Sequence, residues 1–592
     1  MKSYINKYLL GSMAMVALGL SSCVGDLDQF PKNPTDLTPD QFASNPKEYI
    51  GGALGKCYSG IAISGQGGSG SSDISGLDNG RSCWSRAIFM LNEFTTDECL
   101  WIWKDSGVFD LCTSTWSSNN ENVFGTYSRL YTHIAVCNDF IRLSRKLGDY
   151  GITTGDGANQ ISQADLDQFV LEARALRGLS YYYVIDLFGN AADAWDNQLT
   201  GEEPPYITRK DLFDKVTADL EDVLANFKES GVYGRIGKDA VEALLAKYYL
   251  NAEVWTGTAR WQECWAHCQN VINNHKGGGF EGSGLAMDYL SVFCANNDMF
   301  APGGSLKAQN EILWNIPYAY QGNITNANGE QQNVWLTQSY GGTSFLILAA
   351  LSDQNTATPG WFGINGQWTC MHARPEFCEK FNFSNGVSQD GRTWLWFTEN
   401  DGFTMANSDF STYKNGYVPN KFTNVYCNAD GTMPRWQDPE TGLPRAGVHD
   451  LSNPENYGIA TYATFAETDY PVIRLAEIYL TAAEAHVRGN VGSQTEALDY
   501  VNIVRRRAGV GNWNAAELTA NNLLDERARE LYWENNRRTD LVRAGMFTSR
   551  YNWSWKNNVE GGAAISDHMN VFPIPTSVIN SYASEYPQNP GY

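Results

Sequence analysis

Apolar side chains recur with the period of an α-helix in two blocks of this chain. In the first block, Leu179, Tyr183 and Leu187 follow Leu176 at distances of 3, 7 and 11 residues, which is the spacing of one helix face. Gly189 then predicts the end of that helix. Further helical patterns follow at 209–228, 238–255 and 258–275, joined by short polar turns.

The second block begins at Pro471 and contains three apolar stripes. They are Leu475, Ile478, Tyr479 and Ala482; then Ala497, Val501, Val504 and Ala508; then Leu524, Ala528 and Leu531. The segments 240–273 and 474–508 have similar lengths, and both predict a helical hairpin with small residues at the contact face. Stacked hairpins of this kind bury a continuous core, so the blocks predict a mostly α fold: a tetratricopeptide-like superhelix of helix pairs.

Between and before these blocks the pattern changes. Glycine, asparagine, aspartate and aromatic residues dominate 277–469, and the early part of the chain has the same character. We therefore expect one domain over 23–592, with a helical scaffold mainly at 120–275 and 470–545. A loop-rich half, mainly 40–119 and 277–469, would contain short helices and few strands. Long structured loops on a rigid scaffold are where binding sites tend to lie.

The first 22 residues predict a secretory signal peptide. Lys2 and Lys7 precede a mostly apolar run from Leu9 to Leu20, which is too short to span a bilayer permanently. Cys23 follows Leu-Ser-Ser, and this segment resembles a bacterial lipobox. The resemblance implies cleavage before Cys23 and acylation of that residue, although an ordinary signal with a chance cysteine is the alternative. Several acyl chains would hold the protein on a membrane stably.

Net charge narrows the range of partners. The formal charge is −23, so the chain has little means of neutralising phosphates, and we expect no nucleic-acid partner. Cys264 and Cys268 flank His267 with helical spacing, but a metal would need further convergent ligands, so we expect buried thiols there. The sequence predicts no cofactor, and a structural calcium ion cannot be derived from it.

Short catalytic motifs are missing from the sequence. No HExxH, GxSxG, Walker loop or paired CxxC occurs, and the glycine-rich run at 65–70 lacks the strand and helix that a dinucleotide fingerprint requires. The absence of these motifs is modest evidence against a hydrolase. A secreted polysaccharide-degrading enzyme remains an alternative, because many glycosidases have no short motif either.

An early aromatic loop is the best candidate for binding. Trp101 and Trp103 alternate, so in an extended segment both face the same side, with the Asp105 carboxylate in line. Indole faces suit the C–H side of a pyranose ring. Arg81 and Trp84, just upstream, would complete such a platform; the alternative is that the two tryptophans are core residues. In the middle region, further candidates are Tyr318, Trp361, Trp368 and Arg374, the last with a structural ion pair as its alternative.

A dense run of alternating charge lies near the C-terminal end of the second block. Its members are Glu526, Arg527, Arg529, Glu530, Glu534, Arg537, Arg538 and Asp540. Catalysis is conceivable there, but we interpret the run as a solvated helix with i,i+4 ion pairs.

Taken in order, several segments resemble the SusD/RagB family of surface lipoproteins from Bacteroidetes glycan-uptake systems. They are the lipobox at Cys23 and the segments 172–182 with 187–189, 470–480 with 482–485, 502–509, 526–531, 573–575 and 589–592. The likeness covers the whole chain, but the middle region gives no residue-level correspondence.

The resemblance implies four tetratricopeptide-type helix pairs, no catalysis and a place on the outer membrane at the cell surface. It also implies a partner, a SusC-like TonB-dependent transporter to which a captured oligosaccharide is delivered. Glycan sites in the family are shallow aromatic arcs from the early loops and the middle insertion. Three rivals remain open: capture of peptides, a polysaccharide-degrading enzyme, and a purely structural lid whose aromatic residues are all core.

Overall fold

The computed structural model describes thirteen stretches of the chain. They are 43–65, 70–198, 202–228, 232–318, 322–325, 331–334, 339–351, 362–364, 366–406, 408–437, 444–446, 465–582 and 586–592. The predicted signal peptide and Cys23 lie outside these residues. The chain divides into two compact units, one holding the residues up to Ala53 together with Leu143–Leu166, the other holding Leu54–Arg142 and Asp167–Tyr592. In the smaller unit, the Lys47 amide donates to the Asn159 carbonyl.

Helices dominate the described residues, which agrees with the predicted fold class. They are α3 (Pro46–Ala62), α4 (Trp84–Asn92), α5 (Val108–Cys112), α6 (Glu121–Arg145), α7 (Gln163–Phe188), α8 (Arg209–Asn226), α9 (Lys238–Leu250), α10 (Ala252–Thr256), α11 (Trp261–His275), α12 (Thr343–Ala350), α13 (Pro375–Cys378), α14 (Leu475–Gly489), α15 (Gln494–Arg507), α16 (Ala520–Leu531), α17 (Arg537–Arg543) and α18 (Thr576–Ile579). Short 3₁₀ helices occur among the loops, such as Leu290–Phe293, Asn297–Phe300 and Lys307–Gln309. None of the described helices is long and apolar enough to cross a membrane.

The strands form two-stranded antiparallel ladders. They are β1 (Leu100–Trp101) with β7 (Met371–His372), β2 (Ala191–Ala192) with β3 (Tyr206–Ile207), β4 (Ile312–Ile316) with β10 (Tyr470–Arg474), β5 (Gly322–Thr325) with β6 (Gln331–Val334), and β8 (Arg435–Gln437) with β9 (Pro444–Ala446). Every residue of β4 and β10 is buried. This ladder therefore joins the middle region to the helical scaffold through a continuous core.

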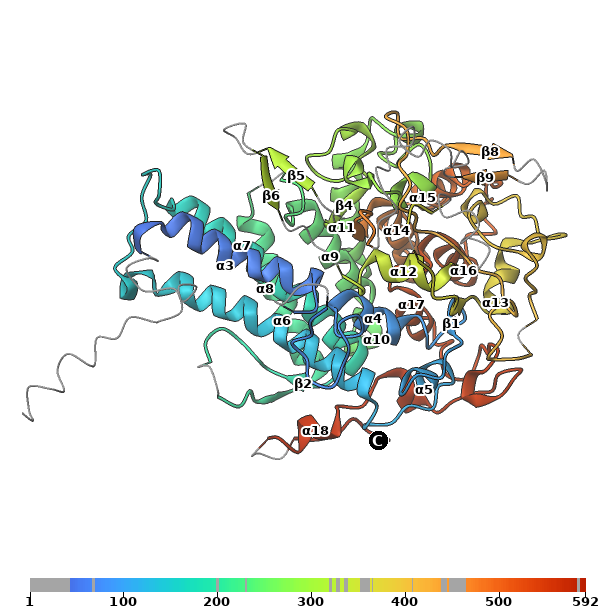
Figure 1. Cartoon of the computed structure of the whole chain (residues 1–592), viewed down its shortest axis with the longest axis horizontal. Helices are drawn as coiled ribbons and strands as arrows, with labels where there is room; N and C mark the ends of the chain where they lie inside the picture. Colours follow the sequence, from blue (N-terminus) through green and yellow to red (C-terminus); the bar gives the residue numbers. More distant parts are fainter. Residues whose placement is uncertain are drawn as a thin grey trace, which may run out of the picture. The chain divides into compact units, whose positions relative to one another are not determined.

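The helical scaffold of the larger unit is a stack of antiparallel pairs. Helix α11 packs against both α9 and α14, and α14 packs against α15 (Figure 1). The turn between α14 and α15 lies directly on α11: a Cβ at Gly492 would come within 2.1 Å of the Trp265 ring, and Gly492 has a φ of +66°. Only glycine meets both demands without strain. The two predicted hairpins are thus present, and they stack on each other.

The alternating-charge run is not a solvated helix, and that interpretation was wrong. Glu526 and Glu530 in α16 are fully buried. Glu530 pairs with Arg474 at 2.7 Å and Arg507 at 2.5 Å, while Glu526 pairs with Arg392 at 2.9 Å. These arginines come from distant segments, so the charges are compensated inside the core. Spacing along one helix cannot reveal partners that only the tertiary fold supplies.

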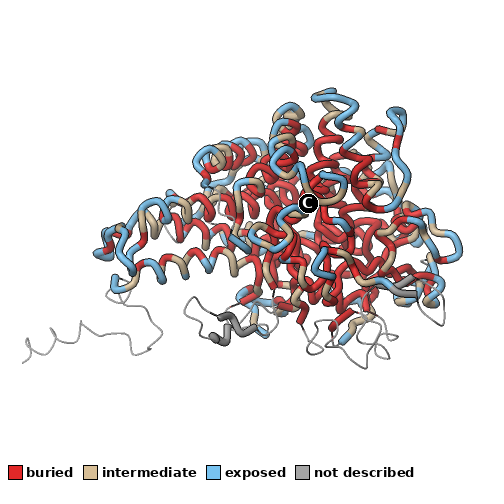
Figure 2. The backbone as a smooth tube through the Cα atoms, turned by 90° about the horizontal axis from the view of Figure 1, so that it is seen from above, coloured by how far each residue is buried: buried red, intermediate tan, exposed pale blue. Residues whose placement is uncertain are grey.

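The burial of the helices and two further sequence-based predictions can be compared with the structure. Residues of the described scaffold are mostly buried along the helices, with exposed positions at the connecting turns (Figure 2). Cys264 and Cys268 lie in α11 as free buried thiols, as predicted. Helix α3, of 17 residues, lies in a stretch for which the sequence suggested mainly loops.

Candidate functional site

The β1–β7 ladder brings together the two regions that the sequence singled out. Trp101 lies opposite Met371, and the Ile102 amide donates to the Cys370 carbonyl at 2.8 Å. The early aromatic loop therefore lies beside the segment 366–374, which contains Trp368. Two segments about 270 residues apart in the chain form one surface.

A cleft of about 530 Å³ opens on this surface. Its lining combines aromatic rings with charged side chains and a backbone wall: Asp78, Asn79, Gly80, Arg81, Arg86, Trp101, Trp103, Asp105, Ser106, Tyr340 and Trp368. Five of these, Arg81, Trp101, Trp103, Asp105 and Trp368, were predicted from the sequence as ligand-binding residues.

The two early tryptophans have different roles in the cleft. Trp103 is 41% exposed, whereas Trp101 is 1% exposed. Their rings meet edge to face with centroids 5.4 Å apart, and the Trp101 indole N–H donates to Asp105 Oδ2 at 2.9 Å. Trp101 is thus a fixed support, and Trp103 presents an indole face to solvent. Tyr340 and Trp368, both half-buried, continue the aromatic wall with centroids 6.2 Å apart.

Arg86 supplies a cation beneath this wall. Its guanidinium carbon lies 4.4 Å from the Phe345 ring centroid and 5.4 Å from that of Trp368, with Trp101 at 5.5 Å. Burial lowers the pKa of Arg86 to about 10, which leaves it charged at neutral pH. Among the described residues it forms no ion pair within 4 Å, and its Nε has no hydrogen-bond partner. Its Nη1 donates to the Tyr340 carbonyl at 3.4 Å, so the guanidinium ties α4 to the aromatic wall and adds positive charge beneath the cleft.

The other charges of the cleft are already paired. Arg81 contacts Asp78 at 2.7 Å and Glu121 at 2.7 Å. Although burial alone would raise it, the pKa of Asp78 is lowered by hydrogen bonds from Arg81 and by the nearby cation Arg86. Asp105 accepts the Trp101 indole N–H. These carboxylates orient the arginine and the indole.

Three predicted residues lie in the core outside the cleft. Trp84 is fully buried, and its indole N–H donates to Ser180 Oγ at 3.0 Å. Tyr318 is also buried, with its hydroxyl 3.2 Å from the Ala62 carbonyl oxygen. Large aromatic side chains have the strongest tendency toward core positions, and sequence spacing cannot separate these two from Trp103. Trp361 lies outside the described residues.

Arg374, the third of these residues, is fully buried, does not line the cleft, and forms no ion pair within 4 Å among the described residues. Its guanidinium donates to four backbone carbonyls: Phe94 at 3.1 Å, Cys99 at 3.3 Å, Cys112 at 2.8 Å, and Ser554. Because Phe94 and Cys99 bracket the start of the aromatic loop, Arg374 holds that loop in place from below.

Comparison with known proteins agrees with this architecture. Residues 310–592 match the model of the SusD family. The chain is 29% identical to the starch-binding protein SusD of Bacteroides thetaiotaomicron, over 98% of this chain and 97% of that protein. The chain is therefore similar to the SusD family in its C-terminal half, and to one SusD protein over nearly its whole length.

Solved structures of SusD-type proteins show the same fold. A SusD superfamily protein from Parabacteroides distasonis aligns with a TM-score of 0.62 at 18% identity, covering 94% of this chain and all of that one. Surface glycan-binding protein A from Bacteroides thetaiotaomicron, solved in complex with laminarihexaose, aligns with a TM-score of 0.58 at 18% identity, covering 92% and 99%.

The sequence-based prediction of the site missed Arg86 and Tyr340. Arg86 lies in α4, all nine residues of which are buried, and its position resembled an ordinary helix interior. The available signal in the sequence was the position of Arg86, a charged residue in the otherwise mostly apolar segment Trp84–Leu91. A buried cation in such a setting needs compensation, here from aromatic faces.

Proposed function

We propose that this protein captures a neutral glycan in the aromatic cleft. The observation that carries the proposal is the exposed indole of Trp103, which lines one cleft together with Trp368 and the Arg86 guanidinium. Flat aromatic faces stack on the C–H side of sugar rings, and guanidinium N–H groups donate to ring hydroxyls. A cleft that offers both is suited to a pyranose chain.

The glycan class we propose is a starch-type α-glucan. The starch-binding relative aligns over almost its full length with this chain, which favours that class. The alternative is a laminarin-type β-glucan, in line with the laminarihexaose that the more distant structural neighbour holds.

Weak binding at a single cleft fits capture and handover. A buried aromatic side chain contributes about 1.5–3 kcal/mol before ordering costs are subtracted. A net of about 5 kcal/mol corresponds to a Kd of roughly 0.2 mM. Polymeric substrate and several membrane-tethered copies raise the effective affinity through multivalency.

Capture without cleavage is part of the proposal. Glycoside hydrolysis requires two carboxyl groups facing the scissile bond, one of them able to give a proton. The two carboxylates that line the cleft, Asp78 and Asp105, are engaged by Arg81 and by the Trp101 indole. A binding role therefore suits the cleft better than hydrolysis.

We further propose that Cys23 carries the lipid anchor, that the protein lies on the outer-membrane surface, and that its partner is a SusC-like TonB-dependent transporter. The lipobox-like segment supports the first point, and the likeness to the SusD family supports the other two. Copurification of a transporter with the tagged full chain, and labelling of intact cells, test these points separately.

Binding is tested by calorimetry and affinity electrophoresis with the full-length protein in detergent. Amylopectin and laminarin are compared for the wild type, for Trp103→Ala plus Trp368→Ala, and for Tyr206→Ala, an exposed aromatic outside the cleft lining, as the control. We expect amylopectin binding that the double variant loses and the control keeps. Equal binding by the double variant would contradict the site. Release of shortened sugars would favour an enzyme, and binding of peptides alone would favour peptide capture.

A further inference from the structure

Three pairs of cysteines lie in contact inside this protein. The eleven cysteines of the described residues are all buried free thiols. Six of them form side-chain hydrogen bonds in pairs: Cys57 with Cys137, Cys264 with Cys268, and Cys294 with Cys427. The export that the N-terminal segment predicts would carry these thiols into a compartment where disulfide bonds form and persist. Backbone geometry separates the three pairs.

Two of the pairs are held by helices. Cys264 and Cys268 are four residues apart in α11, and that spacing places Cβ atoms about 5–6 Å apart. A disulfide needs a Cβ–Cβ distance of about 3.5–4.5 Å, so this pair could close only by distorting the helix. Cys57 in α3 and Cys137 in α6 lie inside two separate helices, whose intrahelical hydrogen bonds restrain both backbones.

The third pair lies on two loop segments that run side by side. Cys294 directly follows the 3₁₀ helix Leu290–Phe293, and Cys427 lies in a stretch without helix or strand. Two backbone hydrogen bonds of 3.0 Å join the segments: Thr423 donates to Phe293, and Ala295 donates to Val425. Loop backbones so close together can supply the small adjustment that formation of an S–S bond needs.

Asn296 fixes both cysteines with one side chain. Its Oδ1 accepts the Cys427 amide at 2.9 Å and lies 3.1 Å from Cys294 Sγ, and its Nδ2 donates to the Cys427 carbonyl at 3.1 Å. The two thiols also have other neighbours: Cys294 Sγ lies 2.9 Å from the Ser291 carbonyl, and Cys427 Sγ lies 3.4 Å from Met299 Sδ. A thiol is a weak donor, so a disulfide would sacrifice little by losing these contacts.

We propose that Cys294 and Cys427 are joined by a disulfide bond in the exported protein. The bond forms by thiol–disulfide exchange: one thiolate attacks the disulfide of an exported carrier protein, and the second cysteine then displaces the carrier. The two cysteines lose two protons and two electrons, and the carrier leaves as a dithiol. Because both sulfurs are buried in the folded protein, the exchange takes place during folding. The inference depends on export and not on glycan binding in the aromatic cleft.

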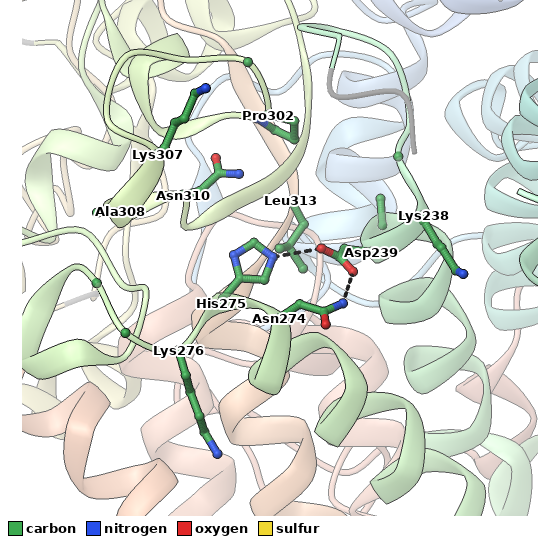
Figure 3. Close-up of a pocket in the computed structure, with 15 residues that line it drawn as sticks. Lys238, Asp239, Asn274, His275, Lys276, Pro302, Lys307, Ala308, Asn310 and Leu313 are labelled. Carbon is green, nitrogen blue, oxygen red and sulfur yellow. Dashed lines mark hydrogen bonds and ion pairs between the residues drawn. The ribbon is translucent and has the colours of Figure 1, made fainter. Parts of the chain in front are cut away.

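The bridge would anchor a loop that lines a cavity. The chain after Cys294 continues into the loop 301–310, which lines a polar cavity of about 680 Å³ together with the start of α9 and the end of α11 (Figure 3). The turn after Cys427 contacts the same loop, since Gln309 Nε2 donates to the Asp430 carbonyl at 3.2 Å. The bond would also close a loop of roughly 130 residues, which stabilises the fold by restricting the unfolded chain.

The bond is detected directly in the full-length protein, purified from membranes in detergent. The unfolded protein is alkylated without reductant, digested and analysed by mass spectrometry. We expect the peptides that contain Cys294 and Cys427 to be cross-linked and the cysteines of the other two pairs to be alkylated. Dithiothreitol added before alkylation should abolish the cross-link.

Thermal unfolding gives a second readout. Dithiothreitol should lower the Tm of the wild type by about 5 °C, because it opens the closed loop. Cys294→Ala plus Cys427→Ala should have a Tm that dithiothreitol does not change. The matched control, Cys264→Ala plus Cys268→Ala, removes the contacting pair in α11 and should keep the full dithiothreitol shift.

Three results would overturn the proposal: alkylation of both Cys294 and Cys427 in the unreduced wild type, a cross-link from either residue to a different cysteine, or a dithiothreitol shift that persists in Cys294→Ala plus Cys427→Ala. The peptide map needs no variant, so it stands even where a variant fails to fold. Failure here is distinguishable from failure of glycan capture. The Cys294→Ala plus Cys427→Ala variant should bind amylopectin as the wild type does, and a wild type that binds no glycan would still show the cross-link.

Discussion

The indole rings of Trp101 and Trp103 meet edge to face at 83°, with centroids 5.4 Å apart, yet one ring is buried and the other is open to solvent. Neighbouring residues of the same type therefore have separable roles. Trp101 holds the floor of the aromatic cleft, and Trp103 offers the face that we propose to contact the glycan.

Truncation of these two tryptophans should separate stability from binding. Trp101→Ala leaves a large cavity in the core and should lower the free energy of unfolding by about 3–5 kcal/mol. Trp103→Ala should change it by less than about 1 kcal/mol, because the ring is exposed, and should abolish amylopectin binding. Urea unfolding and calorimetry on both variants check this. A large loss of stability in Trp103→Ala would show that its ring is structural.

Replacement of Arg374 should disturb the cleft from below. Arg374→Met leaves the carbonyls of Phe94, Cys99 and Cys112 without their donor, and each unsatisfied buried group costs about 1–3 kcal/mol. We expect a loss of about 3–5 kcal/mol in unfolding free energy and weaker glycan binding at temperatures where the variant is still folded.

Arg260→Met is the matched control for that variant, because Arg260 forms a half-exposed ion pair with Glu263. Its stability should stay within about 0.5 kcal/mol of the wild type. Arg374→Met with wild-type stability would mean that the aromatic loop is held by other contacts.

The buried carboxyl groups next to the aromatic loop should make stability depend on pH. Burial raises the pKa of Glu93 to about 7, and burial together with repulsion from Glu93 raises that of Glu98. The facing groups are Asp97 and Arg537, which already pair with each other at 2.7 Å. Because the folded-state pKa of Glu93 exceeds its ordinary value of 4.5, its favourable contribution is complete below pH 4.5 and is lost as pH rises through about 7.

Glu93→Gln should remove the contribution of Glu93 to this dependence and leave that of Glu98, whose pKa burial still raises. Relative to the variant, the wild type should lose up to about 3 kcal/mol of unfolding free energy between pH 5 and pH 8, from 1.36 kcal/mol per pKa unit. Urea unfolding at the two pH values measures the difference. Glu496→Gln, an exposed helix position, serves as the control and should track the wild type. Parallel curves for all three proteins would contradict the buried-carboxyl assignment.

Glu530 is the centre of the buried charge network, and its removal should be strongly destabilising. Burial alone would raise its pKa, but Arg507, Arg474 and Arg392 hold the pKa of Glu530 below its ordinary value. Glu530→Gln leaves these guanidinium groups short of a negative charge in the core, so we expect a loss of about 3–5 kcal/mol. Urea unfolding beside Glu496→Gln, an exposed glutamate of α15 outside the buried charge network, measures it. Similar stability of the two variants would show that the remaining carboxylates suffice.

Much of the fold could be predicted because the helical period is local. The stripes of Leu475 and Ile478, or of Leu176 and Leu179, specify which face of a helix is buried without reference to any distant residue. Helix α3 was not predicted as a helix, because its sequence, PKEYIGGALGKCYSGIA, contains four glycines and few large apolar residues.

The site was predictable only in part, because exposure is decided by distant segments. The aromatic composition of the early loop indicated Trp101, Trp103 and Asp105. The residue spacing, however, did not distinguish a buried indole from a solvent-exposed one. Arg374 and Trp84 were chosen on the same grounds and lie in the core, because backbone carbonyls and Ser180 provide their polar partners.

The sequence by itself thus determined the negative net charge, the helix pairs and the aromatic loop, since each depends on neighbouring residues and on overall composition; the export signal stays a prediction. The tertiary structure decided which rings face solvent, how Arg86 comes to lie unpaired beneath them, and that the charges of α16 are buried. The physical reason is that burial and charge compensation are properties of contacts between residues hundreds of positions apart. Such contacts exist only after the chain has folded.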